Sequence, residues 1–169
     1  VTKLDKLQFV NREEAQAENF RKIFVAMAKD LRVIIIKLAD RLHNMRSLQY
    51  LPEEKQKRIA KETLDIYAPL AGRLGISFFK CELEDLAMKY LLPAEYKYIA
   101  ENVAKKKSER QGFLDAICKQ IEEKLKEMGI HGEVNGRPKH FYSVYKKMHN
   151  LHIDIDQIYD LLAVRIIVD

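Results

Sequence analysis

The sequence predicts a mainly α-helical fold that leads into a short α+β segment at its C-terminal end. Apolar residues recur at three- and four-residue steps through most of residues 13–128, which is the period of amphipathic helices. Glycine and proline are scarce, at 6 and 4 of 169 residues. The strongly β-like run is residues 161–168, near the end of the chain. Because an apolar strand needs neighbours, we expect it to belong to a second domain that is incomplete here.

The first two helices are predicted from their capping residues. Asn11 or Asn19 is a candidate N-cap for an early helix. Asp30 precedes an apolar-periodic run and predicts the N-cap of a helix from residue 31 to about Tyr50. The sequence therefore predicts two consecutive helices before the first proline.

Prolines and glycines mark the next boundaries. Pro52 is followed by two acidic residues, a pattern typical of a helix start. Pro69, Gly72 and Gly75 are expected to break this helix into a tight helical corner. A further helix is expected to end at Pro93.

Two more helices and a change of character follow. Residues 94–110 are expected to form one helix, Gly112 to interrupt it, and residues 114–128 to form the next, with Gly129 as its C-cap glycine. After Gly129, residues 130–135 are expected to be extended and residues 136–138 to form a turn. A short amphipathic helix comes next, with these core-facing residues: Phe141, Val144, Tyr145 and Met148.

Composition excludes several protein classes. The chain has 47% hydrophobic and 33% charged residues, which is ordinary for a globular protein and too apolar for a disordered one. Its longest apolar runs, such as residues 33–36, are far shorter than the ~20 residues of a membrane span. Two cysteines are too few for a disulfide scaffold and fit a reducing compartment. We expect a cytoplasmic protein, and the net charge of +5 favours anionic partners.

A polar stripe interrupts the apolar helix predicted after Asp30. Its members are spaced by 3, 4 and 3 residues and share one face: Lys37, Asp40, Asn44 and Ser47. Apolar residues on the other faces suggest that protein surrounds this helix. A buried Asp40 would then need a cation. An ion pair with Arg41, Arg46 or another basic residue and a bound metal ion both satisfy that need.

A second candidate site lies in an acid-free stretch, residues 134–153. Its basic residues are Arg137, Lys139, Lys146, Lys147 and three histidines. Residues 136–139 predict a turn entering a helix, whose backbone amides and two cations could meet a phosphate. Lys139, Ser143 and Lys147 line one side of that helix. A phosphate site, a solvated basic face and a nucleic-acid patch all remain compatible with this pattern.

Residues 37–46, Lys-Leu-Ala-Asp-Arg-Leu-His-Asn-Met-Arg, resemble the C-terminal metal-site helix of the RelA/SpoT family. These proteins are guanosine tetra- and pentaphosphate (alarmone) synthetase/hydrolases, and their hydrolase is an HD-type metal phosphohydrolase. The resemblance implies that Asp40 is the last ligand of a catalytic Mn²⁺ and that Asn44 and Ser47 lie at the bound nucleotide. Ser47 stands where the family usually has threonine. No histidine precedes Asp40, so we expect this chain alone not to hydrolyse alarmone.

Residues 136–148 and 159–165 resemble the opening of the same family's synthetase domain and its first catalytic strand. This domain transfers pyrophosphate from ATP to the 3′-hydroxyl of GDP or GTP. The resemblance implies that three cations bind the nucleotide phosphates and that Ser143 makes a hydrogen bond. It also implies that Asp160 is catalytic and binds Mg²⁺. The cations are Arg137, Lys139 and Lys147. The family's catalytic glutamate would follow residue 169, so we expect no synthesis by this chain.

The resemblance spans nearly the whole chain and includes residues 66–76, which match the family's connecting helices. It implies a role in the stringent response and three parts: the end of an HD-type hydrolase domain (1–70), connector helices (71–93) and the start of a nucleotidyltransferase-like synthetase domain (94–169). The implied partners are GDP, GTP, (p)ppGpp and ATP, with no membrane. Ribosome or tRNA binding would need regions outside this chain. The alternative is a non-enzymatic basic helical module that binds nucleotides or RNA.

Overall fold

The structure is a computed structural model, which describes residues 30–168. The early helix with Asn11 or Asn19 as its N-cap lies outside the described residues. Within the described part no helix is both long and apolar enough to cross a bilayer.

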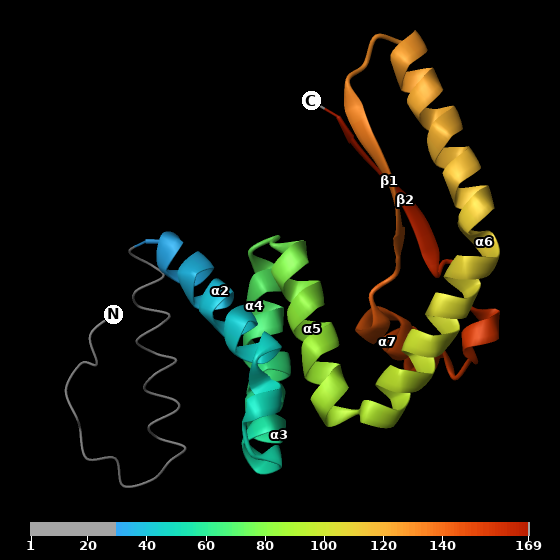
Figure 1. The fold of residues 1–169 in the computed structure, drawn as a ribbon. Coiled ribbons are helices and arrows are strands. Elements are labelled where there is room, and N and C mark those ends of the chain that lie inside the picture. The colour runs from blue at the N-terminus through green and yellow to red at the C-terminus, as the bar shows by residue number, and fades with distance from the viewer. Residues whose placement is uncertain (1–29, 169) are drawn as a thin grey trace, which may run out of the picture.

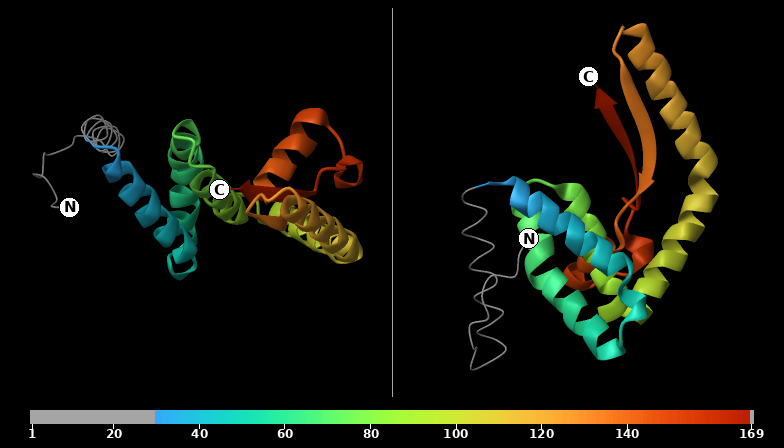
Figure 2. Two further views of the ribbon diagram at one scale, coloured as in Figure 1. Left: turned by 90° about the horizontal axis from the view of Figure 1, so that it is seen from above. Right: turned by 60° about the vertical axis from the view of Figure 1, so that its left-hand side comes forward.

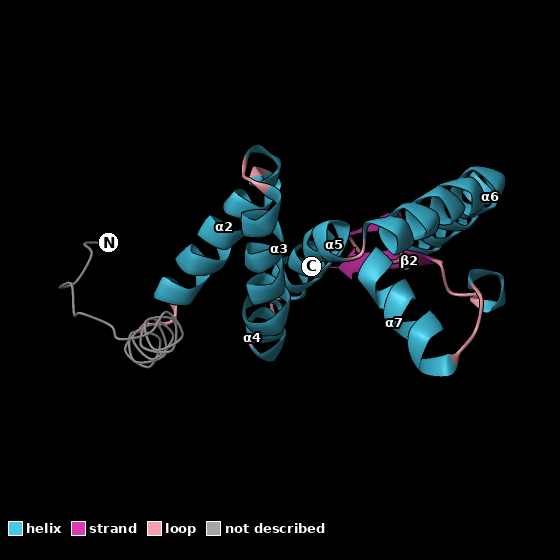
Figure 3. Cartoon of the chain, turned by 90° about the horizontal axis from the view of Figure 1, so that it is seen from below, coloured by secondary structure: helices cyan, strands magenta, loops and turns pink. Residues whose placement is uncertain are grey.

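The described chain forms a helical half followed by a helix-and-sheet half (Figure 1). The helical half contains α2 (Arg32–Arg46), a 3-10 turn (Leu48–Tyr50), α3 (Glu53–Glu62), a π-helical turn (Thr63–Tyr67), α4 (Ala68–Arg73) and α5 (Ser77–Leu91). The second half contains α6 (Pro93–Glu127), β1 (Gly132–Pro138), α7 (Phe141–Leu151), a 3-10 turn (Ile155–Gln157) and β2 (Leu162–Val168). Helices dominate and the sheet has two strands (Figure 3), so the predicted fold class is confirmed.

The helices of the first half pack around one apolar cluster. Its fully buried residues come from α2, the 3-10 turn after it, α3, α4 and α5: Ile34, Leu38, Met45, Leu48, Ala60, Ala68, Ala71, Leu83 and Ala87. On α2 the buried residues recur at three- and four-residue steps, so one stripe of the helix faces the cluster. Asp30 Oδ1 accepts the Arg32 amide at 2.9 Å, which supports its predicted capping role, although Leu31 occupies the N-cap position.

The predicted break at Pro69 is wrong, because the chain stays helical from α3 through α4. Pro69 lies in the first turn of α4, directly after the π-helical turn. A proline there lacks the N–H that an α-helical ladder requires, and the wider π turn accommodates the interruption. The corner comes at Gly75, the last of the three residues predicted to form it, whose φ of 73° lies in the left-handed region that glycine adopts without strain. Pro52 does precede a helix, as predicted.

The predicted interruption at Gly112 is also wrong, since α6 runs unbroken for 35 residues. One glycine in a helix interior costs about 1 kcal/mol, which packing elsewhere on a long helix outweighs. The packing comes from β1, which lies along α6 (Figure 2), with Leu114 and Cys118 facing Gly136. Gly129 has a φ of 68° just beyond the helix, which confirms the predicted C-cap.

The two strands pair antiparallel, from Gly132 opposite Val168 to Pro138 opposite Leu162. Residues 136–138 therefore belong to a strand and not to the predicted turn. Their backbone groups find partners on β2, which sequence periodicity did not predict. Val134 is buried on the face towards α6, whereas Arg137 and its cross-strand partner Ala163 are exposed on the opposite, outer face.

Helix α7 packs against α5 and α6 through a second apolar cluster. Its buried residues are Met88, Ile99, Val103, Val144, Ile155, Ile158 and Leu161. Phe141, Tyr145 and Met148 are partly buried against it, which confirms the predicted core-facing side of this helix. The opposite side of α7 carries Ser143 and Lys147.

Candidate functional site

Two lysines and one aspartate from three parts of the chain meet at the base of the sheet. Lys139 lies between β1 and α7, Lys147 on α7, and Asp160 just before β2. The Lys139 Nζ donates to Asp160 Oδ2 at 2.6 Å, and the Lys147 Nζ donates to Asp160 Oδ1 at 2.8 Å. We call these residues the Lys139–Asp160–Lys147 cluster. The structure thus joins Asp160 to two lysines that sequence analysis had grouped without it.

The two ammonium groups change the acidity of Asp160. Hydrogen bonds from Lys139 and then Lys147 lower the pKa of the Asp160 carboxyl from 3.8 to about 2. The side chain of Asp160 is 54% exposed, and those of Lys139 and Lys147 are 27% and 36% exposed. The cluster is therefore open to solvent and carries one net positive charge at neutral pH. It is accessible to an anion.

Replacing both lysines by methionine should return the pKa of Asp160 towards 3.8. Because the folded pKa lies below the ordinary value, the interaction stabilises the fold above pH 3.8 and is lost as the pH falls from 3.8 towards 2. Exposed ion pairs contribute about 0.2–1 kcal/mol, so the pKa is a sharper readout than thermal stability. Carboxyl-carbon NMR titration measures it. Lys124→Met serves as the control, and an unchanged pKa in the double variant would contradict the observed contacts.

Arg137 and Ser143 extend the cluster on either side. Arg137 and Lys139 are alternate residues of extended chain, so both lie on the outer side of the sheet. Ser143 lies one turn before Lys147 on the same side of α7. Arg165 belongs to this surface although sequence analysis did not select it. It lies opposite Asn135 and diagonal to Arg137 on the outer face, which strand alternation alone would have indicated.

The N-terminus of α7 differs from the expectation that it meets phosphate through its backbone amides. The Tyr142 amide in its first turn donates to Asp85 Oδ1 of α5 at 2.8 Å. A carboxylate thus already occupies the end of the helix that favours anions. The anion-binding potential of this region comes from the side chains of the cluster.

The polar stripe of α2 shares one face, as its spacing predicts, but that face is open. Asp40 and Asn44 are exposed, and Ser47 donates its hydroxyl to the His43 carbonyl at 3.2 Å. The prediction that protein surrounds this helix is wrong for the described residues, because Ile35 and Ile36 are 49% and 61% exposed. The buried stripe centred on Leu38 lies on the side of α2 opposite Asp40.

The predicted ion pairs of Asp40 with its neighbours do not form. Arg41 donates to Glu62 of α3 at 2.7 Å, and its guanidinium stacks 4.0 Å from the centre of the Tyr67 ring. Arg46 contacts Glu82 of α5 at 3.2 Å. Both arginines thus tie α2 to other helices and leave Asp40 directed to the exposed side.

Comparison with known proteins finds a family model for each of two parts of the chain. A family model described as "HD domain" matches residues 1–77, and one described as "Region found in RelA / SpoT proteins" matches residues 136–169. The chain is 55% identical to a GTP pyrophosphokinase of Myxococcus xanthus over 99% of its length. It is 50% identical over its whole length to the bifunctional (p)ppGpp synthase/hydrolase SpoT of Escherichia coli. The chain belongs to the RelA/SpoT family.

The RelA/SpoT relatives are much longer than this chain. The alignments cover 22% of the Myxococcus protein and 24% of the Escherichia coli protein, so the chain spans about a quarter or less of each. The RelA/SpoT match begins at Gly136 and includes the whole Lys139–Asp160–Lys147 cluster. The HD-domain match includes α2 with Asp40.

Membership of the RelA/SpoT family suggests the use of divalent metal ions, and the two carboxylates fit this use differently. Among residues 30–168 no three His, Cys, Asp or Glu side chains come together as metal ligands. Asp40 alone therefore does not make a metal site there. Asp160 is also a single carboxylate, but Mg²⁺ is commonly held by one or two carboxylates together with nucleotide phosphates. Asp160 fits that donor set.

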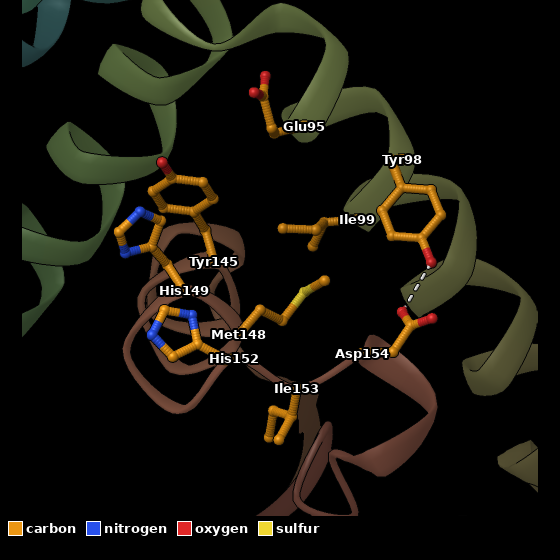
Figure 4. A pocket seen from close by; sticks show the side chains of 9 residues that line it. All are labelled: Glu95, Tyr98, Ile99, Tyr145, Met148, His149, His152, Ile153 and Asp154. Atoms are coloured by element: carbon orange, nitrogen blue, oxygen red, sulfur yellow. Dashed lines mark hydrogen bonds between the residues drawn. The ribbon is translucent and has the colours of Figure 1, made fainter.

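A pocket of about 440 Å³ lies away from the Lys139–Asp160–Lys147 cluster. The α6 and α7 side chains and the loop after α7 line it (Figure 4), including Tyr98, Tyr145, His149 and Asp154. The Tyr98 hydroxyl donates to Asp154 Oδ1 at 3.0 Å at its edge. Tyr145 and His149 lie on the side of α7 opposite Ser143 and Lys147, so this pocket is separate from the cluster.

Proposed function

We propose that this chain forms the nucleotide phosphate-binding part of a (p)ppGpp synthetase, joined to the end of an HD-type hydrolase, and that the protein acts in alarmone metabolism. The observation that carries the proposal is the Lys139–Asp160–Lys147 cluster. It places two cations and a carboxylate within hydrogen-bonding distance in an open site. Phosphoryl-type transfer depends chiefly on positioning and charge neutralisation, which such a set supplies.

Each residue of the synthetase site has a proposed role. Lys139 and Lys147 leave Asp160 to contact the phosphates of ATP and of GDP or GTP, because a polyphosphate offers them more negative charge than one carboxylate. Arg137 adds a third cation from the outer face of the sheet, and Ser143 donates a hydrogen bond. Asp160, released from the lysines, is the proposed catalytic carboxylate and Mg²⁺ ligand. When bound, Mg²⁺ would neutralise charge that develops on the phosphate oxygens.

The hydrolase part is proposed from residues of α2. Asp40 is the proposed Mn²⁺ ligand, and Asn44 and Ser47 are proposed to contact the nucleotide. Asp40 and Asn44 are exposed on one face of α2, and Ser47 is half-buried at the C-cap of that helix; this arrangement supports the proposal. Asp40 needs further protein ligands, so we propose that this chain alone does not hydrolyse (p)ppGpp.

We also propose the division of the chain expected from sequence. Residues 1–70 would form the end of the hydrolase domain, and residues 94–169 would form the start of the synthetase domain. Residues 71–93 would be the helices that connect the two domains. The two separate apolar clusters support two units that meet at α5. Guanine nucleotides and ATP are the proposed partners, and the cytoplasm is the proposed location.

The alternative is a basic RNA-binding module. Its aromatic residues would have to be free to stack on bases. Phe141 packs edge-to-face against Tyr96 with ring centres 5.4 Å apart, and Tyr145 is partly buried against the second cluster. These contacts favour the nucleotide site.

Isothermal titration with ATP, GDP and a short single-stranded RNA tests the proposal. We expect ATP and GDP to bind and each to weaken the binding of the other. RNA should bind weakly and with a steep salt dependence. No pyrophosphate transfer from radiolabelled ATP to GDP should accompany binding by the 169-residue chain. Tight RNA binding without nucleotide binding would favour the alternative, and measurable transfer would contradict the proposed inactivity.

A further inference from the structure

Helix α7 carries no capping side chain of its own. Its N-cap residue is His140, whose side chain makes no capping hydrogen bond, and its first turn contains no acidic residue. The first amides of a helix have no partner inside the helix, and they carry partial positive charge. Lys139 adds a further cationic group beside this end. The local sequence leaves these groups unbalanced.

The missing cap comes from α5. Asp85 Oδ1 accepts a hydrogen bond from the Tyr142 amide at 2.8 Å, and Asp85 Oδ2 lies 3.0 Å from His140 Nδ1. Tyr142 is the second residue of α7, which is a position that an N-cap side chain ordinarily serves. The side chains of Asp85 and His140 are only 18% and 26% exposed, so water competes weakly for these contacts.

The preceding residue of α5 makes a second contact with the same helix. Glu84 Oε1 accepts from Lys146 Nζ at 3.1 Å, and the Glu84 side chain is 8% exposed. Lys146 also lies 4.7 Å from the centre of the Tyr142 ring. Two adjacent carboxylates of α5 therefore hold α7 at its first turn and one turn further on.

The residues held in this way neighbour the two lysines of the cluster. His140 directly follows Lys139, and Lys146 directly precedes Lys147. We propose that Asp85 is a positioning residue of the nucleotide site: by capping α7 and holding His140, it sets the placement of Lys139 and Lys147 about Asp160. The ligand in this inference rests on the proposed function, whereas the capping contact does not.

Asp85→Ala tests the inference with two independent readouts. Amide hydrogen exchange should show that the Tyr142 amide is protected in the unsubstituted chain and exchanges fast in the variant. ATP affinity should fall about fivefold, as expected when a helix loses its cap and the side chains it carries lose their placement. Glu82→Ala is the matched control on α5, because Glu82 contacts Arg46 and should change neither readout.

Two rescues separate positioning from a general loss of stability. Asp85→Asn keeps an oxygen that accepts the Tyr142 amide and should bind ATP within about twofold of the unsubstituted chain. If Asp85→Ala does not fold, Asp85→Asn is the variant whose Tyr142 exchange and ATP affinity are measured. Adding His140→Ser to Asp85→Ala gives α7 a cap of its own and should restore both Tyr142 protection and ATP affinity.

The possible outcomes are distinguishable. An unprotected Tyr142 with unchanged ATP affinity would overturn the positioning role, and unchanged exchange in Asp85→Ala would overturn the cap. Failure of the unsubstituted chain to bind ATP would contradict the proposed function and with it the nucleotide role of Asp85, while the exchange data would still decide the cap.

Discussion

Replacing Lys139 and Lys147 together by alanine should weaken ATP binding by about 100-fold or more. Hydrogen bonds to charged groups contribute about 1.5–3 kcal/mol each, and 1.4 kcal/mol corresponds to a factor of ten in affinity. Each single variant should lose about tenfold. The logarithm of affinity should also fall less steeply with the logarithm of salt concentration in the double variant, because two cations no longer contact phosphate. Isothermal titration at several salt concentrations measures both effects.

Lys119→Ala is the control for this experiment. Lys119 is an exposed cation of α6 outside the cluster, so its loss changes the net charge by the same amount as a single cluster variant. We expect it to bind ATP as the unsubstituted chain does. Equal losses in Lys119→Ala and Lys147→Ala would mean that overall charge, and not the cluster, governs binding.

Leu83→Ala should be the most destabilising single change in the helical half, by about 2–5 kcal/mol. Leu83 is fully buried in the first cluster, and its helix α5 contacts α2, α3 and α4. Truncation removes apolar contacts and leaves a cavity that several rigid helices cannot easily close. Urea unfolding followed by far-UV circular dichroism measures the loss.

Leu151→Ala provides the matched comparison. Leu151 is 58% exposed at the end of α7, so the same chemical change should alter the free energy of unfolding by less than about 0.5 kcal/mol. Similar losses in the two variants would show that Leu83 is not in a closely packed core.

Sequence periodicity predicted most of the helices because each one buries a regular stripe of apolar residues. It failed at Pro69 and Gly112, where residues that usually interrupt a helix lie inside helical segments. The π-helical turn accommodates the proline, and packing of β1 along α6 outweighs one glycine. Such contacts join distant parts of the chain, so no local pattern contains them.

The candidate site was predictable residue by residue but not in its arrangement. Spacing placed Lys139, Ser143 and Lys147 on one side of a helix, which is right for Ser143 and Lys147 but wrong for Lys139, since α7 begins at Phe141. Resemblance selected Asp160. Neither revealed that Lys139 and Lys147 share one carboxylate. Asp85 could not be found from sequence at all, because it caps a helix that begins 56 residues later in the chain. Asp40 was expected to be buried because apolar residues, Ile35 among them, occupy the other faces of α2, yet Ile35 is exposed.

Helix α5 packs against both halves of the described chain, each through a different face. The number of residues between these two faces is therefore fixed by the packing of both halves. Leu83 and Ala87 belong to the first cluster, whereas Glu84, Asp85 and Met88 face the second half. Successive residues of an α-helix are turned by about 100°. One residue inserted after Asp85 would leave Leu83 in place, but it would move Ala87 to the position that faces the second cluster and Met88 to the exposed position that Lys89 holds. The segment of α5 between its two sets of contacts should therefore tolerate substitutions far better than single-residue insertions.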